Sequence, residues 1–562
     1  MRHFVTTLSV LCLALVIPRA GAQQNSPVLQ AMKAELDRSM EKLKSQPVPP
    51  YFLSYEITEN HSVAVTAAFG KLTASTENRR RQLDIDMRVG DYNLDNTREI
   101  RGSTPNMQGS GYQSISAPIE DAPDAIRGVL WYNTDQRYKR AVEQLTKVKT
   151  NVQVKVAQED QSADFTKEEP QHFSEPIVDF QVNRKAWEEK VRKYTAAFGA
   201  YGNIYQANAS LSATAETRWY VNSEGTSIQT SEPAYRLMVV AYTKADDGME
   251  LPLYESYFGF TEKDLPDDAT VLKAVDQMIQ KLEALRVAPL VDPYTGPAVL
   301  SGRAAGVFFH EVFGHRVEGH RQKSANEAQT FKKMIGQPVL SKDFSVYFDP
   351  TQRRAGNTEL AGYYLYDNQG VKARRVTVVE NGVLKTFLMS RTPIEGIPQS
   401  NGHGRKQAGF APVSRQSNLI VEVAPAAIKP DLKKLLIEEI TKQNLPFGLY
   451  FDDIEGGFTM TGRTIPNAFN VLPLVVYRIY QDGHEQLVRG VDLIGTPLVA
   501  FSKIAAADKN VNVFNGVCGA ESGGVPVSAV SPAIFVSQIE VQKKQKSQER
   551  LPVLSAPFEG RN

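Results

Sequence analysis

The 562-residue chain has little cysteine, little histidine and no excess of charge of either sign. It contains 2 cysteines and 8 histidines, and 64 Lys and Arg residues nearly balance 63 Asp and Glu residues, for a net charge of +1. This balance provides no electrostatic reason to expect nucleic acid or an anionic membrane as a partner. Apolar residues make up 42% of the chain, beside 38 Gly and 31 Pro. Collagen-like and wholly disordered chains are therefore excluded.

The apolar run at the N-terminus is shorter than the roughly 20 residues that a membrane span needs. It extends from about Leu8 to Ile17, after a short basic start and before Ala20-Gly21-Ala22. This pattern is typical of a secretory signal peptide. We therefore predict a signal peptide over residues 1–22 and an exported bacterial protein, periplasmic or secreted to the extracellular medium, with no membrane span.

The scarcity of cysteine restricts what the remaining thiol can do. Removal of a signal peptide would take away Cys12 and leave Cys518, so that no internal disulfide could form. A lone thiol in an exported chain is a buried residue, an intermolecular bridge or a functional group.

Helical and strand-like patterns divide the chain into two parts. Apolar residues at three- and four-residue spacing predict helices near 27–45, 123–147, 183–198 and 267–286, and alternating runs predict strands in between. The Pro- and Gly-bearing stretch 288–298 is the candidate boundary. We predict an α+β fold with a signal peptide (1–22), an N-terminal α+β domain of helices and antiparallel sheet (23–290), a strand-rich C-terminal domain (291–541) and a tail (542–562).

The segment 306–321, GVFFHEVFGHRVEGHR, carries the strongest chemical signal. It contains His310-Glu311 followed by His315, an H-E-x-x-x-H pattern. Residues five apart on a regular α-helix lie about 140° apart around its axis, so that two such imidazoles could not bind one ion. We therefore predict a π-bulge or a break near Gly314, which directly precedes His315.

A tetrahedral catalytic zinc site takes three protein ligands and leaves the fourth position to water. His310 and His315 would supply two, and the third could be Glu318, His320 or a residue distant in sequence. Cys518 is the attractive candidate, because thiolate and imidazole both suit zinc. Glu311, next to a ligand, would act as the general base toward a metal-activated water.

These residues and three further stretches resemble the TldD/PmbA family of metallopeptidases. The matching segments are GVFFHEVFGHRVEG (306–319), GVKARRVTVVENGVLKTF (370–387), NGHGR (401–405) and GVCGAESGGVPV (516–527). The resemblance implies a two-domain α+β fold, zinc bound by His310, His315 and Cys518, and peptide hydrolysis with Glu311 as the catalytic carboxylate. Because every element of the motif is present, the chain resembles the catalytic, TldD-like type rather than the companion subunits that lack the histidines.

The resemblance also implies a dimer, formed with a companion family member or with a second copy, around a cavity that admits unfolded peptides. His320 stands where many relatives have an acidic residue, and is a surface residue, a partner of a ligand or a substrate contact. In the NGHGR stretch, His403 or Arg405 would stabilise the oxyanion or bind a peptide carbonyl, unless the stretch is only a solvated turn.

We therefore predict a zinc-dependent peptidase that acts on short or unfolded polypeptides. The alternative is a peptide-binding or partner-subunit scaffold that does not hydrolyse its ligand and retains a structural metal. Retention of Glu311 favours the enzyme.

Overall fold

The computed structural model describes residues 26–100, 115–154, 160–463, 468–544 and 554. The predicted signal peptide (1–22) lies outside the described residues, as does most of the predicted tail (542–562). Within the described part of the chain, no helix is both long and apolar enough to cross a membrane.

The fold is α+β, as predicted, and its strands form two large sheets. The first, seven-stranded sheet has the order β3-β2-β1-β5-β6-β4, with β7 paired to β6. Its strands are β1 (Pro50–Ala68), β2 (Lys71–Val89), β3 (Ile115–Ala117), β4 (His172–Ser174), β5 (Ile204–Asn222), β6 (Ser227–Lys244) and β7 (Glu250–Gly259). All neighbours in it are antiparallel except β4 and β6.

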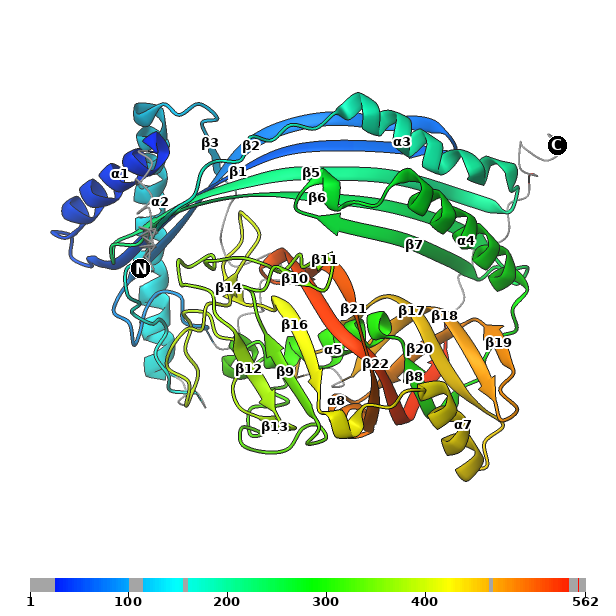
Figure 1. Ribbon diagram of the computed structural model, residues 1–562. Coiled ribbons are helices and arrows are strands. Elements are labelled where there is room, and N and C mark those ends of the chain that lie inside the picture. The colour runs from blue at the N-terminus through cyan, green and yellow to red at the C-terminus, as the bar shows by residue number, and fades with distance from the viewer. Residues whose placement is uncertain (1–25, 101–114, 155–159, 464–467, 545–553, 555–562) are drawn as a thin grey trace, which may run out of the picture.

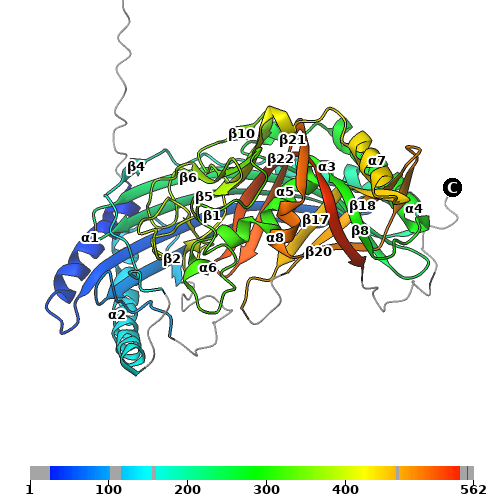
Figure 2. The ribbon, with the colours of Figure 1, turned by 90° about the horizontal axis from the view of Figure 1, so that it is seen from below.

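Four helices cover one face of this sheet (Figures 1 and 2). They are α1 (Pro27–Leu43), α2 (Pro123–Val154), α3 (Arg184–Ala196) and α4 (Asp268–Val287). The alternation of β1 explains the arrangement, because successive side chains of a strand point to opposite faces. Tyr55 packs with α1 and α2, and Val65, ten residues further on, packs with α3 and α4. Short 3-10 segments flank these helices: η1 (Ala197–Ala200) and η2 (Glu262–Asp264).

The other face of the first sheet is polar and lies toward the C-terminal half of the chain, as Figure 1 shows. Glu56 of β1 and Asp84 of β2 are both buried, and both form ion pairs with Lys406. A buried charge is costly unless it is paired. This cluster therefore fixes the C-terminal half against the sheet.

The second, eleven-stranded sheet has the order β13-β12-β9-β16-β22-β20-β18-β17-β8, with β19 paired to β18 and β21 to β22. Because β8 also pairs with β22, the strands β22, β20, β18, β17 and β8 close on themselves. The strands are β8 (Tyr294–Leu300), β9 (Phe344–Phe348), β12 (Val376–Glu380), β13 (Val383–Leu384), β16 (Asn418–Val423), β17 (Phe447–Thr459), β18 (Phe469–Tyr480), β19 (Glu485–Val488), β20 (Val491–Gly495), β21 (Ile504–Ala520) and β22 (Gly523–Lys543).

Shorter elements complete the C-terminal half. Two small pairs of strands are β10 (Arg354–Ala355) with β11 (Thr358–Glu359), and β14 (Gly404–Arg405) with β15 (Val413–Ser414). The helical segments are α5 (Gly302–Val312), η3 (Gly314–Val317), α6 (His320–Lys323), η4 (Pro425–Ala427), α7 (Leu432–Lys442) and α8 (Pro497–Ser502). Strand β8 begins inside the stretch 288–298, the candidate domain boundary, so this stretch is partly a strand of the second sheet.

Helix α5 lies at the centre of the C-terminal half and places the predicted metal ligands. It contacts β22, β17 and β21, and nearly all of its residues are buried. Ser301 caps its N-terminus by accepting a hydrogen bond from the backbone N–H of Ala304 at 3.1 Å. The core around it is aromatic, and Phe308, Phe309 and Phe313 surround Phe501 of α8.

Candidate metal centre

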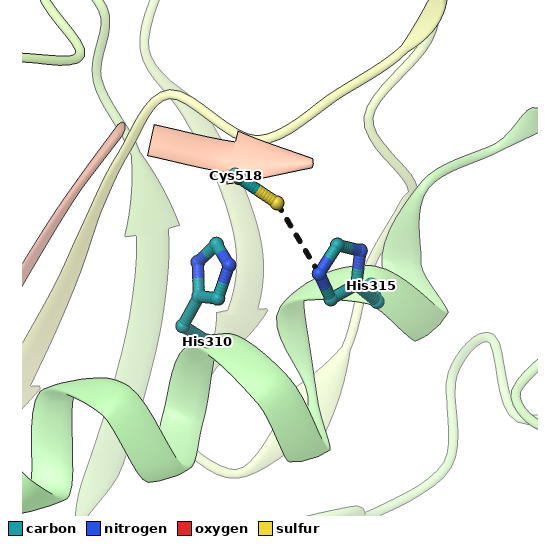
Figure 3. Close-up of side chains that lie close together, drawn as sticks. All are labelled: His310, His315 and Cys518. Carbon is teal, nitrogen blue, oxygen red and sulfur yellow. Dashed lines mark hydrogen bonds between the residues drawn. The ribbon is translucent and has the colours of Figure 1, made fainter. Parts of the chain in front are cut away.

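Three side chains that are far apart in sequence converge at the end of α5. One potential ligand atom from each of His310, His315 and Cys518 lies within 4.8 Å of the other two, and all three residues are buried. Figure 3 shows His310 on α5 and His315 on the following turn, both directed toward Cys518 of β21. The Cys518 Sγ atom lies 3.3 Å from His315 Nε2.

A break in the helix brings the two histidines together. Helix α5 ends at Val312, and the chain continues from Gly314 as the 3-10 segment η3. The predicted irregularity is thus present as a break rather than as a π-bulge. A Cβ atom at Gly314 would lie only 1.9 Å from the Gln416 side-chain oxygen. Glycine is therefore required where the chain changes course.

Glu318 orients His315 from the side away from Cys518. Its carboxylate is fully buried and accepts a hydrogen bond from His315 Nδ1 at 3.2 Å. Because Nδ1 faces Glu318, Nε2 is the nitrogen of His315 that faces Cys518 and that would bind a metal ion after losing its proton. Glu318, which the sequence left open as a third ligand, is therefore placed as the hydrogen-bond partner of His315.

Electrostatics favour a thiolate at Cys518. Burial alone would raise the pKa of the Cys518 thiol, but His315 and His310 outweigh it and hold this pKa well below its ordinary value. Burial alone would lower the pKa of His315, but Cys518 and Glu318 raise it well above the usual range. The site thus stabilises a sulfur anion beside a positive charge. A bound cation would stabilise the same anion.

The donor set fits zinc. Two imidazoles and one thiolate are ligands that this ion prefers, and three protein ligands leave one tetrahedral position open. Ligand atoms at about 2.0–2.3 Å from a tetrahedral zinc are separated by roughly 3.3–3.8 Å. The 3.3 Å between Cys518 Sγ and His315 Nε2 matches such a separation.

Glu311 lies beside this cluster. Its Oε2 atom is 3.9 Å from His315 Nε2, and its side chain retains 11% exposure. Strand β17 passes close by at Gly457, where a Cβ atom would lie 3.0 Å from Glu311 Cγ. The carboxylate therefore borders the cluster without being one of its three ligand groups.

His320 is partly buried and lies outside the cluster of His310, His315 and Cys518. Its ring pairs with Glu521 in the turn between β21 and β22, and its side chain is 16% exposed. Glu521 also accepts a hydrogen bond from Arg321, which in turn donates to Glu318 at 2.9 Å. His320 thus belongs to the charged network that joins the His315 turn to the Cys518 hairpin.

The structure differs from the prediction for His403 and Arg405. Both are buried rather than displayed on a flexible loop. His403 bonds to Ser417 at 3.1 Å, and Arg405 donates to the carbonyl oxygens of Gln416 and Pro526 at 2.5 and 2.8 Å. Both ring nitrogens of His403 and the Nη1 atom of Arg405 are thus engaged with the protein interior.

Sequence reasoning missed Arg415 and Gln416, which lie next to the cluster. Arg415 donates to the carbonyl oxygen of Cys518 at 2.7 Å, and Gln416 donates to that of His310 at 3.3 Å. A polar stretch followed by apolar residues is usual at the start of a strand, so no local signal distinguishes these two residues.

Comparison with known proteins identifies relatives of this chain. The family model described as PmbA/TldA metallopeptidase C-terminal domain matches residues 293–543. A metalloprotease of Methanocaldococcus jannaschii is 29% identical over 237 residues, which are 41% of this chain and 47% of that protein. A metalloprotease TldD homolog of Haemophilus influenzae is 24% identical over 355 residues, 60% of this chain and 68% of that protein.

The likeness extends to solved structures. TldE from Thermococcus kodakarensis superimposes with a TM-score of 0.59 at 13% identity, over 91% of this chain and all of that one. At this identity the likeness shows a shared fold. The sequence matches to three archaeal relatives span 47%, 58% and 65% of their lengths. The names of the relatives imply a metal, and the cluster of His310, His315 and Cys518 offers a site for one.

The comparisons contradict the predicted export. Three of the relatives are archaeal metalloproteases, and nothing in their names or in the described residues is evidence of secretion. The interpretation of the N-terminal apolar run as a signal peptide, with a periplasmic or extracellular location, is therefore corrected. A short apolar run behind basic residues is a weak signal when it stands alone.

Proposed function

The chain belongs to the TldD/PmbA family, and from that premise we propose that it is a zinc-dependent peptidase. The observation that carries this proposal is the convergence of His310, His315 and Cys518 beside the carboxylate of Glu311. A purely structural zinc site is normally closed by four protein ligands, whereas a catalytic site keeps one position open. Three ligand groups with a neighbouring carboxylate correspond to the catalytic arrangement.

Each residue has a separate role in the proposed reaction. His310, His315 and Cys518 hold the ion, and Glu318 keeps the His315 ring in its ligating orientation. When bound, zinc supplies Lewis-acid chemistry, which polarises a carbonyl group and lowers the pKa of water to about 7. Glu311 accepts a proton from the attacking water and returns it to the leaving amine as the peptide bond breaks.

The substrate class that we propose is short or unfolded polypeptides. Glu311 and the three ligand residues are largely buried, so that a folded protein surface could not approach the reacting atoms. At Gly457 the backbone of β17 packs directly against Glu311, because a Cβ atom there would lie only 3.0 Å from Glu311 Cγ. We further propose that the active form is a dimer, with a second copy or with a TldE-like companion.

Replacement of Glu311 by Gln tests the mechanism. The substitution preserves shape and removes the proton acceptor, so we expect cleavage of a denatured polypeptide to fall by at least about 100-fold. Zinc content should remain at one ion per chain. The matched control is Glu439→Gln on α7, which should cleave at the original rate.

Two results would count against the proposal. Cleavage by Glu311→Gln at the rate of the unaltered chain would refute the role of Glu311. An unaltered chain that binds zinc and a denatured polypeptide, yet releases no fragments with or without a companion, would support the scaffold instead.

A further inference from the structure

A run of five consecutive polar residues, Ser414 to Asn418, is completely buried next to the metal centre. Each of the five has 0% exposure. The run connects β15 to β16 and contains no apolar side chain. Polar groups are costly to bury unless they are hydrogen-bonded, so the partners of this run reveal its role.

Arg415 connects two of the three ligand segments. Its Nη2 atom donates to the carbonyl oxygen of Cys518 at 2.7 Å, and its Nη1 atom donates to Ser522 Oγ at 2.7 Å. Its Nε atom forms an ion pair with Glu318 Oε1 at 3.4 Å. The other carboxylate oxygen of Glu318 accepts the hydrogen bond from His315. One guanidinium group therefore contacts the Cys518 hairpin and the partner of His315 together.

Gln416 reaches the third ligand segment. Its Nε2 atom donates to the carbonyl oxygen of His310 at 3.3 Å, and its amide occupies the space left by the missing side chain of Gly314. The contact therefore falls on the last turn of α5, immediately before the break that redirects the chain toward His315.

Two residues of the NGHGR stretch (401–405) form hydrogen bonds with this run. Arg405 donates to the backbone oxygen of Gln416 at 2.5 Å, and the ring of His403 bonds to Ser417. These contacts explain why His403 and Arg405 are buried.

We propose that Arg415 and Gln416 are positioning residues of the metal centre. They fix the positions of the segments that carry His310, His315 and Cys518 relative to one another, so that the three ligand atoms lie close together before an ion binds. Neither residue touches the reacting atoms. The inference depends on the proposed metal site, but not on hydrolysis.

The test measures metal binding rather than activity. In the full-length chain, Arg415→Met and Gln416→Met each remove the donors and keep an unbranched side chain. Partners of metal ligands are worth about 10- to 100-fold in affinity, so we expect each variant to bind Zn²⁺ that much more weakly in competition with a chromophoric chelator. The visible absorption of the Co²⁺-loaded chain should change in position and intensity, because the ligand geometry is altered. Arg415→Lys should restore part of the affinity.

Arg391→Met is the matched control. Arg391 is also fully buried, but its guanidinium stacks on Phe165 and donates to the carbonyl oxygen of Thr166, away from the ligands. This variant should keep the zinc affinity and the Co²⁺ spectrum of the unaltered chain. The comparison separates a positioning role from the general cost of losing a buried arginine.

The outcomes are distinguishable. The positioning roles would be overturned if Gln416→Met and Arg415→Lys both kept the zinc affinity and the Co²⁺ spectrum of the unaltered chain. Where Arg415→Met folds, it would have to keep them as well. The proposed peptidase would remain intact in that case. If Arg415→Met does not fold, weakened binding by Gln416→Met still supports the inference. An unaltered chain that binds no zinc would overturn the metal site and this inference with it.

Discussion

His403 is fully buried beside Ser417, and burial lowers the pKa of its imidazole to about 3. An unfolded chain titrates histidine near 6.5. As the pH falls from about 6.5 to about 3, the unfolded chain binds a proton at this residue and the folded chain does not. The free energy of unfolding therefore decreases as the pH decreases, by up to about 1.4 kcal/mol for each pH unit.

Replacement of His403 by Gln should flatten this acid dependence. Gln stays neutral and retains a donor for Ser417, so the contribution of His403 between pH 6.5 and 3 disappears. Urea unfolding of both chains across this range measures the difference. Two curves of free energy against pH that remain parallel would show that His403 does not carry this dependence.

Some residues of the candidate site could be predicted from the sequence and others could not, for physical reasons. His310, Glu311 and His315 form a local pattern, and Cys518 stands out because cysteine is scarce. Arg415 and Gln416 carry no such signal, because their partners lie about 100 residues away in either direction. A motif marks which residues matter, but burial decides whether they face a substrate or the protein interior, as His403 and Arg405 demonstrate.

At the scale of the element, the break between α5 and η3 determines the geometry of the site. It follows from Gly314, where a Cβ atom would collide with Gln416. We expect Gly314→Ala to destabilise the fold by about 1–3 kcal/mol, as overpacking usually does, and to weaken zinc binding. Thermal unfolding and chelator competition measure both effects.

Gly128 in α2 is the matched control, because a Cβ atom there would meet nothing within 4 Å. Alanine within a helix is favoured over glycine by about 0.5–1 kcal/mol, so Gly128→Ala should stabilise the chain without changing zinc affinity. Equal effects of the two substitutions would contradict the close contact at Gly314.

The elements themselves were predicted unevenly. Helix α1 was predicted almost to the residue, because its apolar stripe and the Ser26 cap are both local signals. Strands β1 and β2 are each 19 residues long. Residues 71–80 of β2 are mostly exposed, so no apolar alternation marks them as a strand. Their conformation follows mainly from the pairing with β1, a contact distant from any local pattern.

At the scale of the whole molecule, the metal should contribute to the stability of the fold. The ligands come from α5, η3 and β21, which are separate in the unfolded chain. An ion that binds only the folded state stabilises it by roughly 2.7 kcal/mol at a hundredfold excess over Kd. We expect added Zn²⁺ to raise the unfolding temperature of the unaltered chain, and a chelator to reverse the rise.

Cys518→Ala controls for nonspecific effects of the ion, since it removes one ligand and leaves the two histidines. This variant should show a much smaller rise in unfolding temperature under the same conditions. A rise of equal size in both chains would mean that the ion binds elsewhere.

The central claim is that His310, His315 and Cys518 bind one zinc ion. Anomalous diffraction at the zinc absorption edge, from crystals of the full-length chain grown with zinc, tests it most directly. We expect one strong peak about 2.0–2.1 Å from a nitrogen of each imidazole and about 2.3 Å from the Cys518 sulfur. A zinc peak bound by other residues, with the Cys518 sulfur remote from both rings, would contradict it.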